Sequence, residues 1–192
     1  GVPHSRIHVI PNGVNTSTFR PVAVDEALRK SLGLTDKHFV AIFTGLHGLA
    51  HGLETIIEAA TQLRDDPAMR FLLVGDGPQK DAMKKLADSR SLSNVIFHPA
   101  VPEEQLPSFL ALANAGLDCR RRIGISRMTL PVKMFSYMAC EVPVVLCIEG
   151  EAVDVLRSSG AGIALPPEDP KALADALRAM CEGTAAYGDA ES

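Results

Sequence analysis

The stretch 119–140 (CRRRIGISRMTLPVKMFSYMAC) gathers positive charge without a single intervening acid. Its basic residues are Arg120, Arg121, Arg122, Arg127 and Lys133. Guanidinium groups bind phosphate oxygens through paired hydrogen bonds, and the free amides of a following helix N-terminus also favour anions. The stretch therefore predicts a diphosphate pocket, with Lys133 in the first helical turn as the best single candidate. The alternative is a solvated basic surface loop.

A second group of candidate residues lies in the stretch 43–60 (FTGLHGLAHGLETIIEAA), which runs from a strand-like end through glycines into a helical pattern. His47 and His51 have the spacing at which two histidines on one helix share a metal ion. The glycines beside them disfavour a continuous helix, and no nearby cysteine or acid offers a third ligand, so we expect no metal here. Two interpretations stay open. One is a tight turn without a ligand role; the other is a substrate-facing loop, in which Gly45 and Gly48 allow close approach and His47 donates to a phosphate or sugar oxygen.

The segment 74–80 (VGDGPQK) is another junction of strand, glycine and helix. Gly75 and Gly77 either permit close approach of a ligand or merely form the turn. The segment lacks the third glycine of the GxGxxG pattern, and no acid near residue 96 is placed to bind a ribose hydroxyl. A dinucleotide-binding motif therefore has little support here.

The segment 147–156 (CIEGEAVDVL) also ends a strand-like run and opens a helical one through Gly150. Glu151 and Ala152 could present backbone amides to an anionic or hydroxyl-bearing ligand. Alternatively, Glu151 is only an acid that interacts favourably with the dipole of its own helix.

The elements that must position these residues can be read from the apolar pattern. Short continuous apolar runs are typical of strands that are covered on both faces. The strand candidates are 7–10, 38–44, 70–74, 94–97, 115–118, 143–147 and 162–165.

Helical patterns separate these runs. They cover 53–63 (closed by Pro67), 78–88, 103–113, 131–140 (with Pro131 at the first helical position) and 169–181. Alternating strands and helices predict a Rossmann-like, doubly wound parallel sheet in three α/β/α layers. Ligands bind such sheets at the carboxyl ends of the strands. We therefore expect the function in loops 44–52, 75–78, 98–103, 119–131 and 148–151.

The overall composition is that of an ordinary globular protein of 192 residues, with 46% apolar and 22% charged residues. We expect one domain over 1–182 and a disordered tail over 183–192. The net charge of −4 argues against a dedicated nucleic-acid binder. The four cysteines form no CxxC pair and are expected to be reduced. No Ser/His/Asp or Cys/His arrangement supports hydrolytic catalysis. The chain begins at Gly1, which suggests a piece of a longer protein.

Four segments together resemble the carboxyl-terminal domain of family 4 glycosyltransferases with the GT-B fold. They are HVIPNGVNTSTFRP (8–21), NVIFHPAVPEEQLPSFLALANAGLD (94–118), LPVKMFSYMACEVPVV (130–145) and GAGIALPPEDPKALADAL (160–177). The resemblance covers about residues 5–182. The form GLHGLAHGLETIIEAA, followed by EGEA, is similar to bacterial O-antigen transferases of the fucosamine type.

This resemblance implies the donor-binding half of an enzyme that transfers a sugar with retention of anomeric configuration. It implies that Lys133 contacts phosphate and that Ser136 lies where the family usually has a ribose-binding glutamate. It also places residues 150–152 near the sugar or phosphates, and Pro99 to Val101 near the base. No cofactor is implied.

The sequence departs from the family pattern at four positions. Leu46 and His51 stand where an arginine and a lysine are frequent, and Met128 and Ser136 stand where the family has a spaced pair of glutamates. Our hypothesis is that Arg127 replaces the lost positive charge. The departures leave two alternatives open: a degenerate, non-catalytic nucleotide-binding or interaction domain, and an enzyme similar to nucleotide-sugar epimerases.

The resemblance also implies partners. The donor is a nucleotide diphosphate sugar, with a UDP-sugar favoured, and a preceding amino-terminal domain holds a glycan or lipid-linked acceptor. The expected location is the cytoplasm, with membrane contact only through a lipid-linked acceptor and a peripheral position at the inner membrane in the longer protein.

Overall fold

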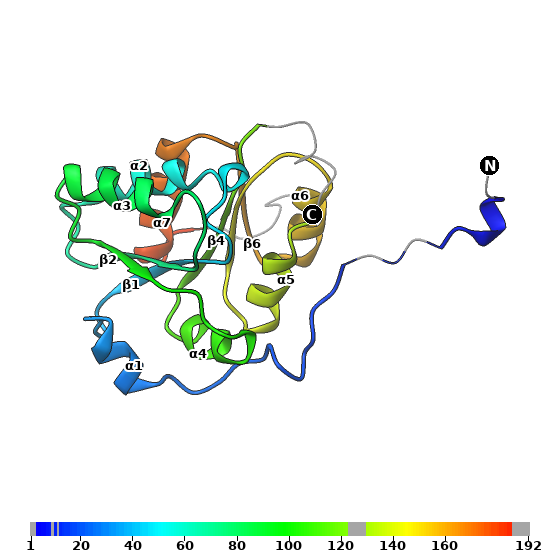
Figure 1. Ribbon diagram of the computed structural model, residues 1–192, viewed down its shortest axis with the longest axis horizontal. Coiled ribbons are helices and arrows are strands. Elements are labelled where there is room, and N and C mark those ends of the chain that lie inside the picture. Colours follow the sequence, from blue (N-terminus) through cyan, green and yellow to red (C-terminus); the bar gives the residue numbers. More distant parts are fainter. Residues whose placement is uncertain (1–2, 9, 11, 123–129, 186–192) are drawn as a thin grey trace.

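The computed structural model describes residues 3–8, 10, 12–122 and 130–185. Its centre is a six-stranded, all-parallel sheet with the strand order β3-β2-β1-β4-β5-β6 (Figure 1). The strands are β1 (Phe39–Thr44), β2 (Met69–Val74), β3 (Val95–His98), β4 (Ala115–Cys119), β5 (Val144–Cys147) and β6 (Gly162–Leu165).

Helices cover both faces of the sheet and form the two outer layers (Figure 1). The helices are α1 (Glu26–Ser31), α2 (Leu53–Gln62), α3 (Lys80–Ser89), α4 (Leu106–Leu110), α5 (Val132–Ala139), α6 (Glu151–Ser159) and α7 (Pro170–Cys181), with 3-10 turns η1 (His4–Arg6), η2 (Leu49–His51) and η3 (Glu103–Gln105). One core joins α2, α3 and α7 to one face of the sheet, and a second core joins α4, α5 and α6 to the other. The predicted doubly wound α/β sandwich is confirmed.

The order in which strands are added to the sheet reverses between β1 and β4. From β1 the chain proceeds outward through β2 to β3, and it then returns to place β4 on the other side of β1. The helices after β1 and β4 therefore pack on opposite faces. In open α/β sheets this switch point is where a crevice forms for ligands.

Six of the seven predicted strands are present with bounds shifted by at most one residue. The prediction of a strand at 7–10 is wrong, because residues 7, 8 and 10 belong to no strand and are exposed. Figure 1 shows this amino-terminal segment leading away from the sheet, so no neighbouring strand is there to accept its backbone bonds. The carboxyl-terminal residues 186–192 of the predicted tail lie outside the described residues.

The helix predictions need three corrections. Pro131 precedes α5 in an extended conformation and is not its first residue. The segment 103–113 divides into η3 and the short α4, which ends at Leu110. Helix α1 was not predicted, since none of its residues is buried; the Asp25 side chain caps it by accepting from two backbone amides.

Candidate functional site

A pocket of about 370 Å³ opens at the carboxyl ends of the strands, on the face covered by α5. Four separate parts of the chain form it: an amino-terminal segment, the end of β1, the segment after β3, and the first turns of α5. The lining residues are Gly13, Val14, Asn15, Phe19, Thr44, Gly45, Val101, Glu103, Leu106, Val132, Lys133 and Ser136. Four residues predicted for the donor site (Gly45, Val101, Lys133 and Ser136) are thus brought together.

Lys133 contributes a largely buried cation to this pocket. Its side chain is 13% exposed, and its Nζ lies 3.8 Å from the centre of the Phe43 ring. The Nζ has an ion-pair contact of 3.5 Å with Asp118 but no hydrogen bond to any described residue. Burial lowers the pKa of Lys133, although the Asp118 carboxylate opposes that shift. An ammonium group with unfilled donor capacity beside a pocket is suited to bind an anion.

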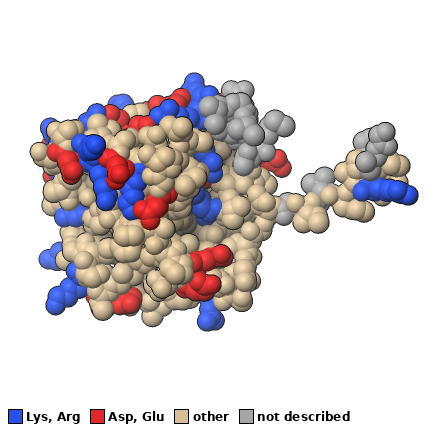
Figure 2. Space-filling model, in the orientation of Figure 1, with Lys and Arg blue, Asp and Glu red and all other residues tan. Residues whose placement is uncertain are grey.

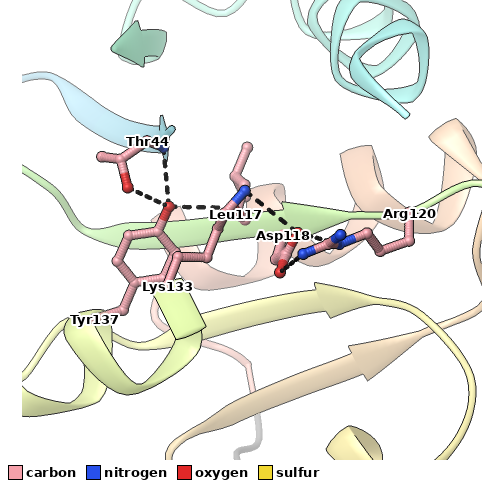
Figure 3. A network of polar contacts seen from close by, with 6 residues as sticks. All are labelled: Thr44, Leu117, Asp118, Arg120, Lys133 and Tyr137. Carbon is pink, nitrogen blue, oxygen red and sulfur yellow. Dashed lines mark hydrogen bonds and ion pairs between the residues drawn. The ribbon is translucent and has the colours of Figure 1, made fainter. Parts of the chain in front are cut away.

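Asp118 is the counter-ion of this region and was missed by the sequence analysis. It lies at the end of β4 with its side chain fully buried, and it accepts from Arg120 at 3.1 Å as well as contacting Lys133 (Figure 3). A buried carboxylate between two cations offsets the cost of removing them from water. Its signal in the sequence was an acid two residues before the arginine run.

Tyr137 holds α5 against the sheet. Its phenolic oxygen accepts from the backbone N–H of Thr44 at 3.0 Å, and the hydroxyl donates to the carbonyl of Leu117 at 3.3 Å (Figure 3). The ring fits because residue 116 is glycine, where an added Cβ would lie 2.4 Å from the ring. Tyr137 therefore sets the position of Lys133 and Ser136, which are carried by the same helix.

Replacing Tyr137 with phenylalanine should lower the free energy of unfolding by about 1–2 kcal/mol, because the buried N–H of Thr44 loses its acceptor. Urea denaturation of the two proteins measures this difference. Because the ring packing is kept, the slope of unfolding against urea should not change. A variant as stable as the wild type would show that the phenol bonds contribute nothing to stability.

His47 lies inside the domain and not on the wall of the pocket. Its side chain has no exposed surface, and its ring centre is 5.8 Å from that of Phe43 and 6.4 Å from that of Phe97. Neither ring nitrogen has a hydrogen-bond partner among the described residues. A bond from His47 to a phosphate or sugar oxygen, which the sequence suggested, has no support in this arrangement. Burial, with a smaller contribution from Lys80, lowers the pKa of His47 from 6.5 to about 4.

This buried imidazole should make stability depend on pH. The unfolded chain takes up a proton on His47 near pH 6.5, whereas the folded protein does so only near pH 4. The contribution of neutral His47 to the free energy of unfolding is therefore fully present above pH 6.5. As the pH falls from 6.5 to 4, this contribution should decrease by about 1.4 kcal/mol for each pH unit. Denaturation at several pH values should show a shallower decline in the His47→Leu variant. The exposed His8→Gln serves as the control and should keep the wild-type slope; equal slopes for all three proteins would contradict the assignment.

Gly75 and Gly77 serve the contact between two loops. A Cβ on Gly75 would lie 1.8 Å from the carbonyl oxygen of Gly45, and one on Gly77 would lie 2.7 Å from that of His47. Both glycines also have a positive φ, 154° and 152°. Of the two interpretations, the structure thus supports a packing role, in which the loops after β1 and β2 approach backbone to backbone. Neither glycine lines the pocket described above.

Comparison with known proteins identifies the family. The family described as "Glycosyl transferases group 1" matches residues 24–189 of the chain. The chain belongs to the glycosyl transferases group 1 family.

The curated relatives of this group 1 domain are about twice its length. A protein of Escherichia coli (strain K12), named as a colanic acid biosynthesis glycosyl transferase WcaI, is 32% identical over 186 residues, which are 93% of this chain and 44% of that protein. A GDP-mannose-dependent alpha-(1-6)-phosphatidylinositol monomannoside mannosyltransferase of Mycolicibacterium smegmatis is 29% identical over 95% of this chain and 51% of its own. The chain spans about half the length of the curated relatives that it matches.

Solved structures show the same fold. The Anabaena protein Alr3699/HepE, in complex with UDP-glucose, superimposes with a TM-score of 0.78 at 22% identity, over 92% of this chain and 48% of that one. The C-terminal domain of the group 1 protein LpcC from Francisella tularensis gives 0.72 at 17% identity, over 88% of each chain. The expected assignment to the carboxyl-terminal half of a GT-B fold is confirmed. The matches favour neither the epimerase-like nor the non-catalytic alternative.

The remaining predicted residues of the group 1 domain lie apart from the Lys133 pocket. Gly150 and Glu151 line a second, more open pocket of about 610 Å³ between α6 and the ends of β5 and β6. Gly150 precedes α6 without a side-chain cap, and Ala152 is buried and does not line that pocket. The sequence left two interpretations of Glu151, and both fit its place in the first turn of α6.

Pro99 and Gly48 line neither of these two pockets. Pro99 is exposed, in the segment that leads from β3 to Val101. Gly48 precedes η2, where an added Cβ would lie 3.2 Å from the Leu46 side chain. His51 follows in the same turn; burial, with a further contribution from Lys133, lowers its pKa to about 4.

Arg127 and Met128 lie outside the described residues, so the hypothesis that Arg127 supplies positive charge stays a prediction. Arg120 and Arg121 are engaged in ion pairs with Asp118 and Glu54. They are thus not a freely solvated basic loop. Arg122, the third arginine of the run, is exposed.

The charges on the surface of the group 1 domain are mixed. On the face shown in Figure 2, basic and acidic side chains lie beside one another in the upper part of the molecule, and much of the lower part is uncharged. In the described ranges, no three or more His, Cys, Asp or Glu residues gather as a potential metal site. No helix of the described part of the chain is long and apolar enough to cross a bilayer. The four cysteines are free thiols, as expected.

Proposed function

We propose that this domain is the donor-binding half of a retaining glycosyltransferase, which moves a sugar from a nucleoside diphosphate to a glycan or a lipid-linked acceptor. The observation that carries the proposal is the pocket at the β1/β4 switch point, whose lining includes Lys133, a residue with a buried ammonium that has no hydrogen-bond partner among the described residues. Membership of the group 1 family supports it.

The proposed role of Lys133 is to stabilise the negative charge that develops on the departing diphosphate. Such stabilisation is strong in a site that excludes water, because the charge is fixed in place before the reaction. Ser136, one turn along α5 and also on the pocket wall, would bind the ribose by its hydroxyl group. The free amides at the start of α6 would contact the sugar or the phosphates.

UDP is the first candidate nucleotide and GDP the second. A structural neighbour from Anabaena is described in complex with UDP-glucose, while curated relatives from mycobacteria are named as GDP-mannose-dependent. The acceptor would be held by a preceding domain; the relatives that the chain matches are about twice its length. We propose a cytoplasmic enzyme that reaches the inner membrane only through its acceptor.

Thermal unfolding with UDP, GDP and ADP, each at millimolar concentration, tests this proposal. A ligand at 100 times its Kd should add about 2.7 kcal/mol to the stability. For a chain of this length that corresponds to a rise in Tm of about 5–10 °C. One nucleotide should stabilise more than the others. If none of the three raises the Tm, the chain has no donor site of this kind and the proposal fails.

A further inference from the structure

The segment His98–Val101, which joins β3 to the pocket, is bound by two side chains from the neighbouring part of the chain, Asp76 and Lys80, in addition to the pairing of His98 within the sheet. Asp76 Oδ2 accepts from the backbone N–H of Ala100 at 2.6 Å. Lys80 Nζ donates to the backbone carbonyl of His98 at 3.0 Å. Asp76 belongs to the connection between β2 and α3, and Lys80 is the first residue of α3, so both bonds come from outside the segment's own stretch of chain.

Asp76 and Lys80 are also bound to each other. Lys80 Nζ donates to Asp76 Oδ1 at 2.7 Å and to the carbonyl of Gly75 at 2.7 Å. All three N–H donors of the Lys80 ammonium are therefore bonded inside the protein. These bonds explain how the charged group is tolerated on a side chain that is only 10% exposed. The two residues form one unit, the Asp76–Lys80 clip.

The clip joins three loops. The backbone carbonyl of Asp76 accepts from the N–H of His47, in the loop after β1, at 2.9 Å. Its carboxylate reaches the segment after β3, and its own backbone belongs to the loop after β2. A single residue thus fixes three adjacent carboxyl-terminal loops relative to one another.

The clip also determines which backbone groups remain for a ligand. The N–H of Ala100 is occupied by Asp76, whereas no described residue bonds to the backbone N–H or C=O of the next residue, Val101. Val101 lines the pocket that also contains Lys133. A free N–H and C=O at one residue can pair with the polar edge of a nucleobase, which presents neighbouring donors and acceptors.

We propose that Asp76 and Lys80 are positioning residues for nucleobase recognition, which hold the 98–101 segment so that Val101 presents its backbone to the base of the donor. This inference rests on the proposed function. Neither residue touches the donor; both act through the segment that does. The pKa of Asp76 is lowered, first by its hydrogen bond with Lys80 and then by that with Ala100, so the carboxylate stays charged at neutral pH.

The test separates the nucleoside from the diphosphate. Calorimetry measures the affinity of the chain for UDP and GDP and, separately, for inorganic pyrophosphate. In Asp76→Ala, the affinity for the nucleotide that the wild type prefers should fall at least 10-fold, while that for pyrophosphate should change less than twofold. Asp76→Asn keeps an oxygen that can accept from Ala100, so it should lose less than Asp76→Ala.

Asp81→Ala is the matched control. It removes the next acid along the chain, which is exposed in the first turn of α3, and it should bind both ligands as the wild type does. Equal losses of nucleotide and pyrophosphate in Asp76→Ala would mean a general disturbance of the site, and no loss of either would mean no positioning role. Each of these results overturns the inference.

Hydrogen exchange tests the same inference without any ligand. The amide of Ala100 should exchange at least fivefold faster in Asp76→Ala than in the wild type. Its exchange rate in Asp76→Asn should lie between those of Asp76→Ala and the wild type. Unchanged exchange would refute the inference even if the chain binds UDP. Conversely, a wild-type chain that binds no nucleoside diphosphate refutes the proposed function, and the role in base recognition with it, whatever the exchange shows.

Discussion

Replacing Lys133 with methionine should weaken the binding of the preferred nucleoside diphosphate by about 10- to 100-fold, because a hydrogen bond to a charged group contributes about 1.5–3 kcal/mol. Methionine keeps the length of the side chain and its contact with the Phe43 ring. The variant removes the 3.5 Å contact of the Lys133 ammonium with Asp118, but that buried carboxylate keeps its ion pair with Arg120. Because Asp118 is not left without a cation, the Tm without ligand should stay close to that of the wild type.

Calorimetric titration of the wild type and Lys133→Met with the same nucleotide checks this result. Lys171→Met is the control, since it removes a cation that is 77% exposed on α7 and should leave the affinity unchanged. If Lys133→Met binds as tightly as the wild type, then the ammonium does not contact the diphosphate. The combination of lost affinity and retained Tm distinguishes a binding role from a structural one.

Gly75→Ala should lower the free energy of unfolding by about 3 kcal/mol or more, with a fall in Tm of about 6–12 °C. Two costs combine. The backbone of Gly75 has φ 154°, a conformation that side chains disfavour, and the added Cβ would lie 1.8 Å from the carbonyl oxygen of Gly45. The Cβ is fixed to the backbone of residue 75, and the oxygen it meets belongs to the backbone of Gly45. Neither atom can move away as the end of a flexible side chain can.

Gly160→Ala separates these two costs. Gly160 also has a positive φ, 62°, but an added Cβ would meet no atom within 4 Å. The control should therefore lose only about 1 kcal/mol, the cost of the left-handed backbone alone. Chemical denaturation of both variants gives the comparison. Equal losses would show that the close approach of the two loops does not contribute.

The sheet was predictable from sequence because its strands are covered on both faces. A run such as Phe39–Thr44 is buried almost throughout, and no other environment suits an unbroken apolar run of that length. The same rule produced the error at 7–10, where an apolar run has no neighbouring strand beside it. Helix α1 was not predicted because it has no buried apolar face to give a helical pattern; it is capped by the Asp25 side chain.

The site was predictable only in part. Lys133 and Ser136 follow from a motif, since both lie on one side of a helix whose start the sequence marks with a proline. The orientation of His47 does not follow, because an imidazole is compatible with a pocket wall or with a core. Asp118 looked like the end of a strand, and its role appears only when Lys133, 15 residues along the chain, folds back to it.

The seam between β1 and β4 has a mechanical consequence. β1 and β2 are in register over six residue pairs, whereas β1 and β4 share only the two pairs that begin at Ala41 and Ile42. Side chains fasten the seam at its two ends: Asn114 accepts from the N–H of Val40 at one end, and Tyr137 from that of Thr44 at the other. Of the five strand pairings in this sheet, that of β1 with β4 is thus the shortest. A ligand that contacts both Gly45, directly after β1, and Lys133, on the helix after β4, would add contacts across this short pairing.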